Sequence, residues 1–448
     1  MSDASAAARL DQLRALAQAE DLRPFLRRAI QLHPSDLAEV LAAVDGAARA
    51  RALAELPVET ASKALAELEG RLRHPLELLR AVGPDYVAEL LAELPSDDAA
   101  AIIRDLPSEE REAVLSEVAD RAEVDQVLKY PADSAGGLMS TEVVTVDEEA
   151  SLVEAIADIR RQSAEDDALY QVYAVDGARR LKGVVPVARL IVASPARRVR
   201  EVMEAPAAAV RPEIDQEQVA RLMARYNVAA VPVVDEGNRL LGRVTFDDVI
   251  DVVERETTED LLKFASVSPE EDLSAPWTAA VKSRLPWLYV NLLTAFLAGA
   301  VVYVFQGTVS RVVALAVWMP IIAGMGGNAG TQALAVTVRR LALRLLPRDR
   351  ALAVIRKEVL VGAVNGIANG VAVALVAAAL GEGWVLGLVV LLAMWGNLVV
   401  AGLAGASIPI VLERFSIDPA IASSIFVTTF TDVCGFVLLL GLGAWLLL

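Results

Sequence analysis

The chain has 448 residues, of which 55% are hydrophobic, and its formal net charge of −17 is distributed unevenly. Residues 284–448 contain ten Lys/Arg and six Asp/Glu, whereas residues 1–283 contain 32 and 53, which gives net charges of +4 and −21. Such acidity argues against nucleic acid or anionic lipid as a partner of the N-terminal part, and it suits either a surface that handles cations or solubility alone. The single cysteine excludes a disulfide within the chain, and residues 1–28 lack an apolar signal segment, so we expect the N-terminal part to stay in the cytoplasm.

The first part of the chain is predicted to be all-helical, because proline followed by an acid recurs at the starts of short segments. Proline fits the first turn of a helix, and acids there complement the helix dipole. The predicted starts are Pro34-Ser35-Asp36, Pro57-Val58-Glu59, Pro84-Asp85, Pro95-Ser96-Asp97 and Pro107-Ser108-Glu109. Most of these acids are interpreted as solvated, with Asp98 as a candidate metal ligand. His33 and His74 lack metal-ligand spacing and are predicted to be structural.

Residues 129–259 contain an internal repeat. Val175-Asp176 followed by Gly183 recurs as Val234-Asp235 followed by Gly242, with an offset of 59 residues both times. Each copy combines a β-rich run, at 143–146 and 228–234, with an amphipathic helix, at 151–162 and 215–226. Two such copies can stack and leave a cleft between them.

The two copies differ at the position where such a cleft would bind a ligand. The second has Gly242, Thr245 and Asp248 in a Gly-x-x-Thr-x-x-Asp pattern, whereas the first has Pro186 and Arg189 at the matching places. Thr245 and Asp248 can hydrogen-bond to ribose hydroxyls, or they can simply cap the following helix.

Acidic side chains crowd the stretch that leads from the second copy toward the C-terminal half. Only Arg255 opposes them. Like charges at this density repel one another, so the pattern predicts a segment that binds cations. These acids are Asp247, Asp248, Asp251, Glu254, Glu256, Glu259 and Asp260.

The C-terminal part contains five apolar segments long enough to cross a bilayer, which takes about 20 residues. They are Leu285–Phe305, Val312–Val338, Val359–Leu380, Val385–Val411 and Ile421–Leu447. The connection 339–357 carries seven Lys/Arg, and such an excess marks the cytoplasmic side. Lys282 and Arg284, ahead of the first segment, agree with this orientation. An odd number of spans then places the C-terminus outside.

Asp432 lies inside the last apolar segment, which contains no basic residue. A carboxylate at the bilayer centre costs about 2.5 to 3.5 kcal/mol or more, so such a residue usually faces a water-filled path or binds a cation. The alternative is a carboxylate that hydrogen-bonds to Thr428, Thr429 or Thr431 and only fixes helix packing.

The second apolar segment is also unusual, because Pro320 is followed by the glycine-rich polar stretch 324–332, which includes Asn328. Glycines allow close helix packing, and they free backbone carbonyls to face a pore where the helix is loosened. Together with Asp432, this stretch offers an all-oxygen site for a hard cation such as Mg²⁺ or Ca²⁺. Three further membrane asparagines are interpreted as interhelical contacts, namely Asn365, Asn369 and Asn397.

Two of these stretches resemble the signature sequences of the MgtE family of magnesium channels and transporters. They are Pro320-Ile-Ile-Ala-Gly-Met-Gly-Gly-Asn-Ala-Gly-Thr-Gln332 and Thr431-Asp-Val-Cys-Gly435. The resemblance covers most of the chain, and the internal repeat resembles a CBS-domain pair. It implies a multidomain fold with an all-α superhelical N-domain (1–130), two α/β CBS domains (131–200 and 201–262), a connecting plug helix (263–284) and a transmembrane pore domain of five helices (285–448). The plug helix would begin at Ser274, with Trp277 as its membrane-interface anchor.

The same resemblance assigns residues to a pore and to a sensor. In the pore of a homodimer, Asp432 would hold a hydrated Mg²⁺ beside Asn328 and the carbonyls of Gly324 and Thr428, although Thr428 is larger than the residue expected there. In the family, Mg²⁺ bridges acidic faces of the CBS and N-domains and closes the pore. The implied regulatory ligands are Asp98, Gly136 through its carbonyl, Asp215, Glu217, Asp248, Asp251, Glu256, Glu259, Asp260 and Asp418. Asn227 stands where an acid is expected, and CBS pairs often bind adenine nucleotides, so Thr245 and Asp248 are candidate ATP ligands.

The sequence therefore predicts a homodimeric Mg²⁺ channel of the plasma (inner) membrane, surrounded by lipid, closed by cytoplasmic Mg²⁺ and needing no other protein partner. Flux would be passive and the chain would not be an enzyme, since it has no Walker A pattern or other hydrolytic constellation. Loose, water-retaining oxygen coordination favours Mg²⁺, and a regulated carrier of Mn²⁺, Co²⁺ or Ca²⁺ is the alternative. A membrane-anchored enzyme or nucleotide sensor is disfavoured, because an anchor needs neither Asp432 nor a polar second span.

Overall fold

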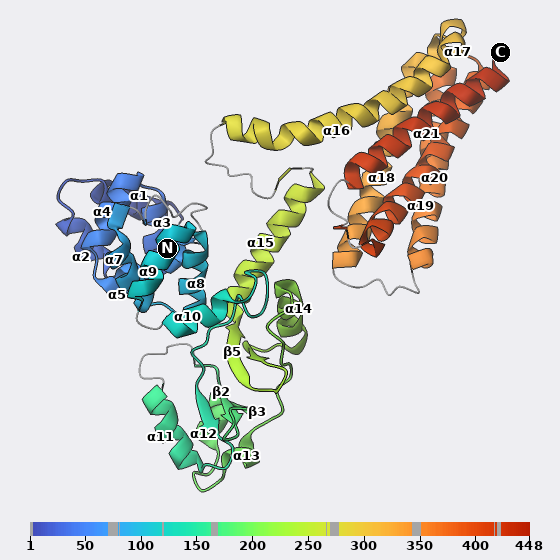
Figure 1. The fold of residues 1–448 in the computed structure, drawn as a ribbon. Coiled ribbons are helices and arrows are strands. Elements are labelled where there is room, and N and C mark those ends of the chain that lie inside the picture. Colours follow the sequence, from blue (N-terminus) through green and yellow to red (C-terminus); the bar gives the residue numbers. More distant parts are fainter. Residues whose placement is uncertain are drawn as a thin grey trace. The chain divides into compact units, whose positions relative to one another are not determined.

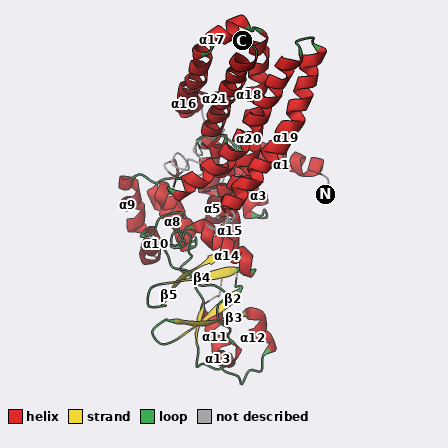
Figure 2. Ribbon diagram, turned by 90° about the vertical axis from the view of Figure 1, so that its right-hand side faces the viewer, coloured by secondary structure: helices red, strands yellow, loops and turns green. Residues whose placement is uncertain are grey.

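The computed structural model describes residues 3–69, 79, 81–118, 121–162, 169–265, 267–268, 277–342, 351–415, 417–418 and 423–448. The chain divides into two compact units, Met1–Glu256 and Thr257–Leu448. Short helices and small sheets make up the first unit and long helices the second (Figures 1 and 2). The predicted succession of an all-α part, an α/β repeat and a helical membrane bundle is confirmed.

The first unit begins with short helices whose starts follow the predicted proline pattern. Pro34 and Pro84 are the first residues of their helices, and Pro57, Pro95 and Pro107 each directly precede one. His33 has the predicted structural role, since its Nδ1 accepts a hydrogen bond of 3.3 Å from the backbone N–H of Ser35 and caps a helix. His74 lies outside the described residues. The helices are α1 (Asp3–Ala17), α2 (Arg23–Ala29), α3 (Pro34–Ala42), α4 (Gly46–Glu55), α5 (Val58–Glu69), α7 (Pro84–Ala92), α8 (Ser96–Asp105), α9 (Ser108–Glu117) and α10 (Arg121–Leu128).

The internal repeat appears as two similar α/β halves. In the first, β1 pairs in parallel with β2, and β2 pairs antiparallel with β3; in the second, β4 pairs antiparallel with β5. Val172 faces Val185 in the first half, and Val231 faces Val244 in the second, which reproduces the 59-residue offset in three dimensions. The elements are β1 (Thr145–Asp147), α11 (Leu152–Gln162), β2 (Gln171–Val175), β3 (Leu181–Pro186), α12 (Val187–Val192), α13 (Val199–Val202), α14 (Gln216–Tyr226), β4 (Ala230–Val234), β5 (Leu240–Thr245) and α15 (Phe246–Phe264).

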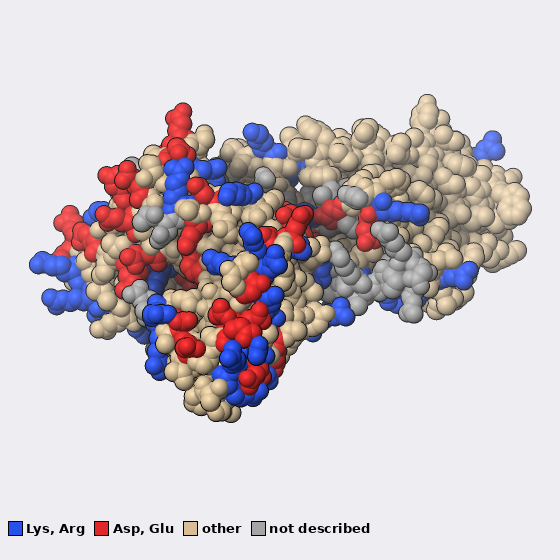
Figure 3. Space-filling model, turned by 60° about the horizontal axis from the view of Figure 1, so that its bottom comes forward, with Lys and Arg blue, Asp and Glu red and all other residues tan. Residues whose placement is uncertain are grey.

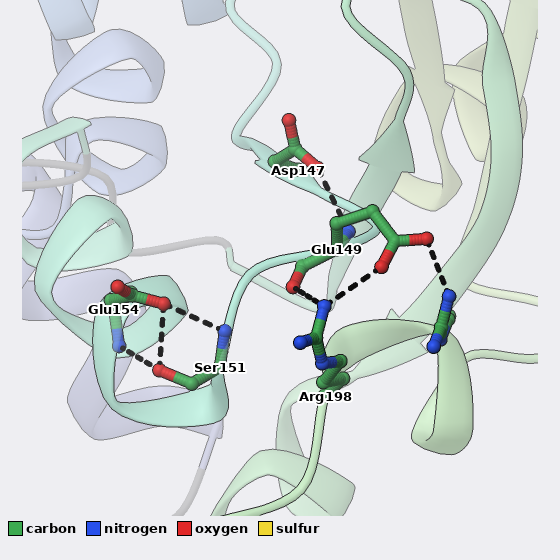
Figure 4. Close-up of polar contacts among 6 residues, drawn as sticks. Asp147, Glu149, Ser151, Glu154 and Arg198 are labelled. Carbon is green, nitrogen blue, oxygen red and sulfur yellow. Dashed lines mark hydrogen bonds and ion pairs between the residues drawn. The ribbon is translucent and has the colours of Figure 1, made fainter.

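Polar contacts fix the loop that enters α11 (Figure 4). Ser151 donates to the Glu154 carboxylate through both its N–H and its Oγ, each at 2.8 Å, and its Oγ accepts from the Glu154 N–H at 3.3 Å. This reciprocal pair is a capping box. Glu149 joins the same loop to Arg198 at 2.9 Å and Arg200 at 2.7 Å. These ion pairs are half exposed, so each contributes little stability and mainly sets the direction of the chain.

The second unit is a bundle of long helices. Helix α20 packs against α18, α19 and α21, and α21 also packs against α16. Three α19 glycines, spaced by four residues, let α19 approach α20 closely: a Cβ built on Gly362 would lie 2.2 Å from the Leu398 carbonyl oxygen. The helices are α16 (Trp277–Val304), α17 (Gln306–Arg311), α18 (Ala314–Ala342), α19 (Ala351–Ala379), α20 (Trp384–Arg414) and α21 (Ser423–Leu446).

Among the described residues, four helices are long and apolar enough to cross a membrane, namely α16, α19, α20 and α21. Helix α18 has 29 residues, which is ample length, but glycines and polar side chains occupy its middle. The predicted boundary between plug helix and first span is not a helix break, because α16 runs without interruption through Arg284 and contains Pro286 in its interior. Residues 274–276 lie outside the described part.

The two units differ in surface chemistry. Red and blue side chains are spread among uncharged ones over the visible face of the first unit, whereas the long helices of the second present mostly uncharged atoms (Figure 3). Helix α16 has many exposed large apolar side chains, including Leu293 at 69% and Phe296 at 65%. An apolar surface of this kind suits lipid or a second copy of the bundle.

Candidate functional site

The four residues predicted for the pore lie on two helices that touch. Gly324 and Asn328 are one turn apart on α18 and are both exposed in the single chain. Thr428 and Asp432 are one turn apart on α21, and both are partly exposed. The two pairs meet where a Cβ built on Gly327 would lie 3.8 Å from Cγ2 of Thr428. The structure therefore brings these residues to adjoining faces of α18 and α21.

The threonines around Asp432 do not donate to its carboxylate. Thr428 Oγ1 donates to the Ser424 carbonyl at 2.9 Å, Thr429 Oγ1 to Ile425 at 2.7 Å, and Thr431 Oγ1 to Thr428 at 2.9 Å. Within the described part of the chain, no hydrogen-bond donor or basic side chain contacts the Asp432 carboxylate. This arrangement disfavours the packing-only interpretation, which needs those hydroxyl groups.

Of the two roles considered for the α18 glycines, close packing or a loosened helix, the structure shows close packing. The α-helix is continuous from Ala314 to Ala342 despite Pro320. The glycines instead allow close packing: a Cβ built on Gly330 would lie 2.5 Å from Cγ1 of Val427 on α21. The Gly324 carbonyl is thus part of a regular helix, and a Cβ built on Gly324 would meet no atom from another helix within 4 Å among the described residues.

In the first unit, an acidic cluster forms around Asp97, which sequence reasoning overlooked in favour of Asp98. Burial first, and then the charges of Asp248, Asp98 and Glu142, raise the pKa of Asp97 well above its usual range. Its Oδ1 is buried and has no hydrogen-bond partner among the described residues. Glu142, also overlooked, is held by Ser96, whose N–H and Oγ donate at 3.1 and 3.0 Å. The sequence does show two acids close after Pro95, namely Asp97 and Asp98. Which of the two side chains points toward the interior depends on how α8 is rotated in the fold.

Thr245 and Asp248 are joined by hydrogen bonds at the start of α15, where the Asp248 carboxylate accepts from Thr245. The Thr245 hydroxyl donates to Asp248 Oδ2 at 2.6 Å, and the Thr245 N–H donates to the same atom at 3.3 Å. Burial raises the pKa of Asp248 to about 6, although the Thr245 hydrogen bonds oppose the shift. In the first repeat, Arg189 instead forms an ion pair with Glu204. Only the second repeat therefore presents the polar pair predicted for a nucleotide.

Other predicted regulatory residues already have structural partners. Asp215 caps α14 by accepting from the Glu217 N–H at 2.9 Å, and Glu217 pairs with Arg221 at 2.7 Å. Glu256 accepts from Gln216 Nε2 at 2.6 Å.

The remaining predicted sensor positions lie in different surroundings. Burial raises the pKa of Asp251 despite the nearby charge of Arg255. Gly136 lies so close to Tyr130 that a built Cβ would be 2.5 Å from the ring. Asp260 lies on α15 and takes part in a polar or electrostatic interaction. Asn227 ends α14 in the left-handed conformation, with φ of 52°, which is a common role for asparagine and explains its presence where an acid was expected.

Lys263 lies between two of the predicted sensor ligands in the second unit. Its Nζ is 2.8 Å from Asp418 Oδ2, and it also forms an ion pair with Glu259. Burial opposes the charge, but hydrogen bonds to the two carboxylates raise the pKa of Lys263 above its usual range. An ammonium group thus occupies a position between carboxylates that could otherwise share a cation.

No group of three or more His, Cys, Asp or Glu side chains is arranged to hold a metal ion within the described ranges. The predicted regulatory ligands accordingly occupy several separate places. The acidic cluster around Asp97 and the pair formed by Glu259 and Asp418 belong to different units of the chain.

The raised carboxyl pKa values predict how stability depends on pH when Mg²⁺ is removed. Asp97 and Asp248 hold protons in the folded state at pH values where the unfolded chain, with carboxyl pKa values near 3.8, has lost them. For Asp248 this contribution to stability is therefore fully present below about pH 3.8 and is lost as pH rises through about 6, and the raised pKa of Asp97 acts in the same direction. Thermal unfolding of residues 1–256 in chelator should occur at a higher temperature at about pH 5 than at about pH 8. The variant Asp97→Asn/Asp248→Asn should lose most of this difference, and an undiminished difference would contradict the assignment.

Comparison with known proteins places these features in a family. The sequence matches the models for the MgtE divalent cation transporter over residues 319–442, the MgtE intracellular N domain over 32–133, and the CBS domain over 135–195 and 199–255. The magnesium transporter MgtE of Bacillus subtilis is 33% identical over 423 residues, which cover 94% of this chain and 93% of that protein. The magnesium transporter MgtE of Thermus thermophilus is 38% identical over 335 residues, which cover 73% of each chain.

Two solved structures resemble the N-terminal part. The cytosolic domain of the Mg²⁺ channel MgtE in complex with ATP matches with a TM-score of 0.50 and 36% identity, covering 54% of this chain and 99% of that one. The soluble part of a magnesium transporter matches with a TM-score of 0.52 and 26% identity, covering 56% and 99%.

Proposed function

Because this chain belongs to the MgtE family of magnesium transporters, we propose that it is a Mg²⁺-selective channel whose pore is lined by α18 and α21 from two copies of the chain. Membership of a transporter family also means that the chain is not an enzyme. The N-terminal unit would be cytoplasmic, as the name of the related cytosolic domain suggests, and the C-terminus would lie outside the plasma membrane. The basic connection 339–357 supports this orientation.

The observation that carries the proposal is the Asp432 carboxylate. It lies on a membrane-crossing helix, is partly exposed in the single chain, and has no donor or basic partner within the described residues. A charge in that position requires water or a cation. Asn328, exposed on the adjoining helix, adds an amide oxygen. The exposure of this face in one chain supports a dimer, since a second copy would close the path around the ion.

The donor set favours Mg²⁺ over softer ions. Carboxylate, amide and carbonyl oxygens suit hard cations, and Mg²⁺ keeps several of its waters in such sites. The test is ion flux into proteoliposomes, with Mn²⁺, Co²⁺ and Ca²⁺ competing against Mg²⁺. Preferred uptake of Mg²⁺ supports the proposal, and preferred uptake of one of the other ions would replace it with a carrier of that ion.

We also propose that cytoplasmic Mg²⁺ closes the channel. The acids around Asp97 and Asp248 give one region where added cations would relieve repulsion, and the pair Glu259 and Asp418, bridged by Lys263, gives a second, where Mg²⁺ would compete with the ammonium. Cations that bind only the closed arrangement stabilise it by mass action. The plug would be the part of α16 before the predicted first span, which the structure joins to that span in one helix.

Lys263→Gln tests how the second of these regions works. Removing the ammonium leaves Glu259 and Asp418 without the internal cation that pairs with them, so Mg²⁺ should bind there more readily. We expect the cytoplasmic Mg²⁺ concentration that halves the flux to fall several-fold, within the usual range of coupling between sites. Flux measured against internal Mg²⁺ checks this, with Lys63→Gln as a control of equal charge, since Lys63 forms an exposed ion pair with Glu59 on α5. An unchanged or increased half-closing concentration would contradict it.

ATP is proposed as a second ligand of the N-terminal unit. The related cytosolic domain was solved with ATP, and the second repeat keeps Thr245 and Asp248. Binding would require Thr245 and Asp248, which are hydrogen-bonded to each other, to bond to ribose as well. Calorimetric titration of residues 1–262 with ATP, compared with Thr245→Ala, tests the assignment, and equal binding by both proteins would remove Thr245 from the site.

A further inference from the structure

Asn397 lies in the middle of α20, and its side chain is completely buried. Its Nδ2 donates a hydrogen bond of 2.9 Å to the carbonyl oxygen of Ile322 on α18. Its Oδ1 is buried and has no hydrogen-bond partner within the described parts of the chain. The side chain is therefore tied to α18 through one atom, while the other polar atom is left unpaired.

The Asn397 amide fills a space that glycines on two other helices leave open. A Cβ built on Gly326 of α18 would lie 2.2 Å from Asn397 Nδ2, and one built on Gly435 of α21 would lie 2.8 Å from the same atom. Side-chain carbons do not approach other atoms this closely, so a side chain at either position would force the buried Asn397 amide to move. The amide thus contacts the backbones of α18 and α21 at the same time.

These two glycines flank the residues proposed for the pore. Gly326 lies between Gly324 and Asn328, and Gly435 lies one turn after Asp432. Asn397 itself is buried behind them and does not reach the exposed face. Any change in its size or hydrogen bonding therefore shifts the two ligand-bearing stretches relative to each other.

We propose that Asn397 is a positioning residue of the pore, which holds α18 and α21 at the separation that lets Asn328 and Asp432 act on the same hydrated ion. This inference rests on the proposed function. An amide is needed because Ile322 receives a directed hydrogen bond that no apolar side chain can give. If Asn397 served packing alone, leucine of similar volume would fill the space without leaving a buried oxygen unpaired.

The test compares Asn397→Leu with Asn369→Leu in the full-length protein reconstituted into liposomes. Asn369 is the matched control, because the one hydrogen bond of its side chain within the described residues is donated by Nδ2 to the Asn365 backbone carbonyl in its own helix, at 2.9 Å. Asn397→Leu should reduce Mg²⁺ flux at low Mg²⁺ by about tenfold or more, as removal of supporting partners commonly does at metal sites, and should change the ratio of Mg²⁺ to Ca²⁺ flux. Asn369→Leu should change neither.

A change in the ion ratio separates positioning from a merely structural role, which would lower thermal stability and leave the ratio as it is. A folded Asn397→Leu dimer with the wild-type half-saturating Mg²⁺ and ion ratio overturns the inference. Asp432→Asn is measured alongside to keep the two claims distinct. Loss of flux in Asp432→Asn supports the pore assignment, whatever Asn397→Leu does. Retained flux in Asp432→Asn contradicts the pore assignment.

A second pair of variants keeps the inference testable if Asn397→Leu does not fold. Gly326→Ala alone should destabilise the dimer, because its new carbon collides with the Asn397 amide. Gly326→Ala/Asn397→Ala should regain thermal stability, which gives a non-additive double-mutant cycle. The double variant should keep an altered Mg²⁺ to Ca²⁺ ratio, and a wild-type ratio in it overturns the inference.

Discussion

Asp432→Asn should nearly abolish Mg²⁺ flux while the dimer still assembles. Asparagine keeps the size and hydrogen-bonding capacity of the side chain but removes the charge that attracts a divalent ion. Mg²⁺ dehydrates reluctantly, so Asp432 would act on it largely through water, by charge and position. Flux into proteoliposomes, with size-exclusion chromatography to confirm assembly, measures the effect.

Asp432→Glu provides the matched variant, because it keeps the charge and lengthens the side chain by one methylene. It should crowd the hydrated ion and give partial flux or altered selectivity. A packing role predicts the opposite order, with asparagine tolerated and glutamate disruptive. The hydroxyls of Thr428, Thr429 and Thr431 all donate to backbone carbonyls of their own helix, which already disfavours that role. Wild-type flux in folded Asp432→Asn would remove Asp432 from the pore.

Asp248→Asn/Asp251→Asn/Glu259→Gln should leave the channel open at cytoplasmic Mg²⁺ concentrations that close the wild type. The variant removes three negative charges from the acidic stretch of α15. Mg²⁺ then no longer binds the closed arrangement preferentially and no longer stabilises it. In parallel, residues 1–262 of the wild type should become more protease-resistant as Mg²⁺ rises through the millimolar range, and the same fragment of the variant should not.

The control for charge alone is Glu93→Gln/Glu109→Gln/Glu117→Gln, which neutralises three exposed acids on or beside α7 and α9. It should close like the wild type. Equal digestion of the wild-type fragment with and without Mg²⁺, or equal loss of closure in the control, would contradict the sensor assignment.

The fold was predictable where one physical signal dominated. Continuous apolar runs located the membrane helices, and most of their ends agree with the structure to within four residues. Helices α16 and α19 each begin eight residues before the predicted span, since end turns that carry charged residues, such as 351–358, remain helical. Helix-start prolines located the short helices of the first unit, and the 59-residue offset located its α/β repeat. Both signals can be read directly from the sequence.

The sites were less predictable because their contacts join distant parts of the chain. Nothing in the sequence distinguishes Asp97 from the neighbouring Asp98. The packing of α8 is what buries an oxygen of Asp97 near Asp248. Lys263 and Asp418 are 155 residues apart, so their ion pair has no local signal. Asn397 resembles the other membrane asparagines until the glycines that surround it are known.

The most direct test of the central claim is Mg²⁺ uptake by proteoliposomes that contain the purified wild-type chain and no nucleotide, with low Mg²⁺ on the side of the N-terminal unit. We expect uptake that follows the imposed Mg²⁺ gradient, slows when the membrane potential is reversed, and stops as Mg²⁺ rises on the N-terminal side. Absence of gradient-driven uptake in the folded dimer, or uptake only when ATP is supplied, would contradict it.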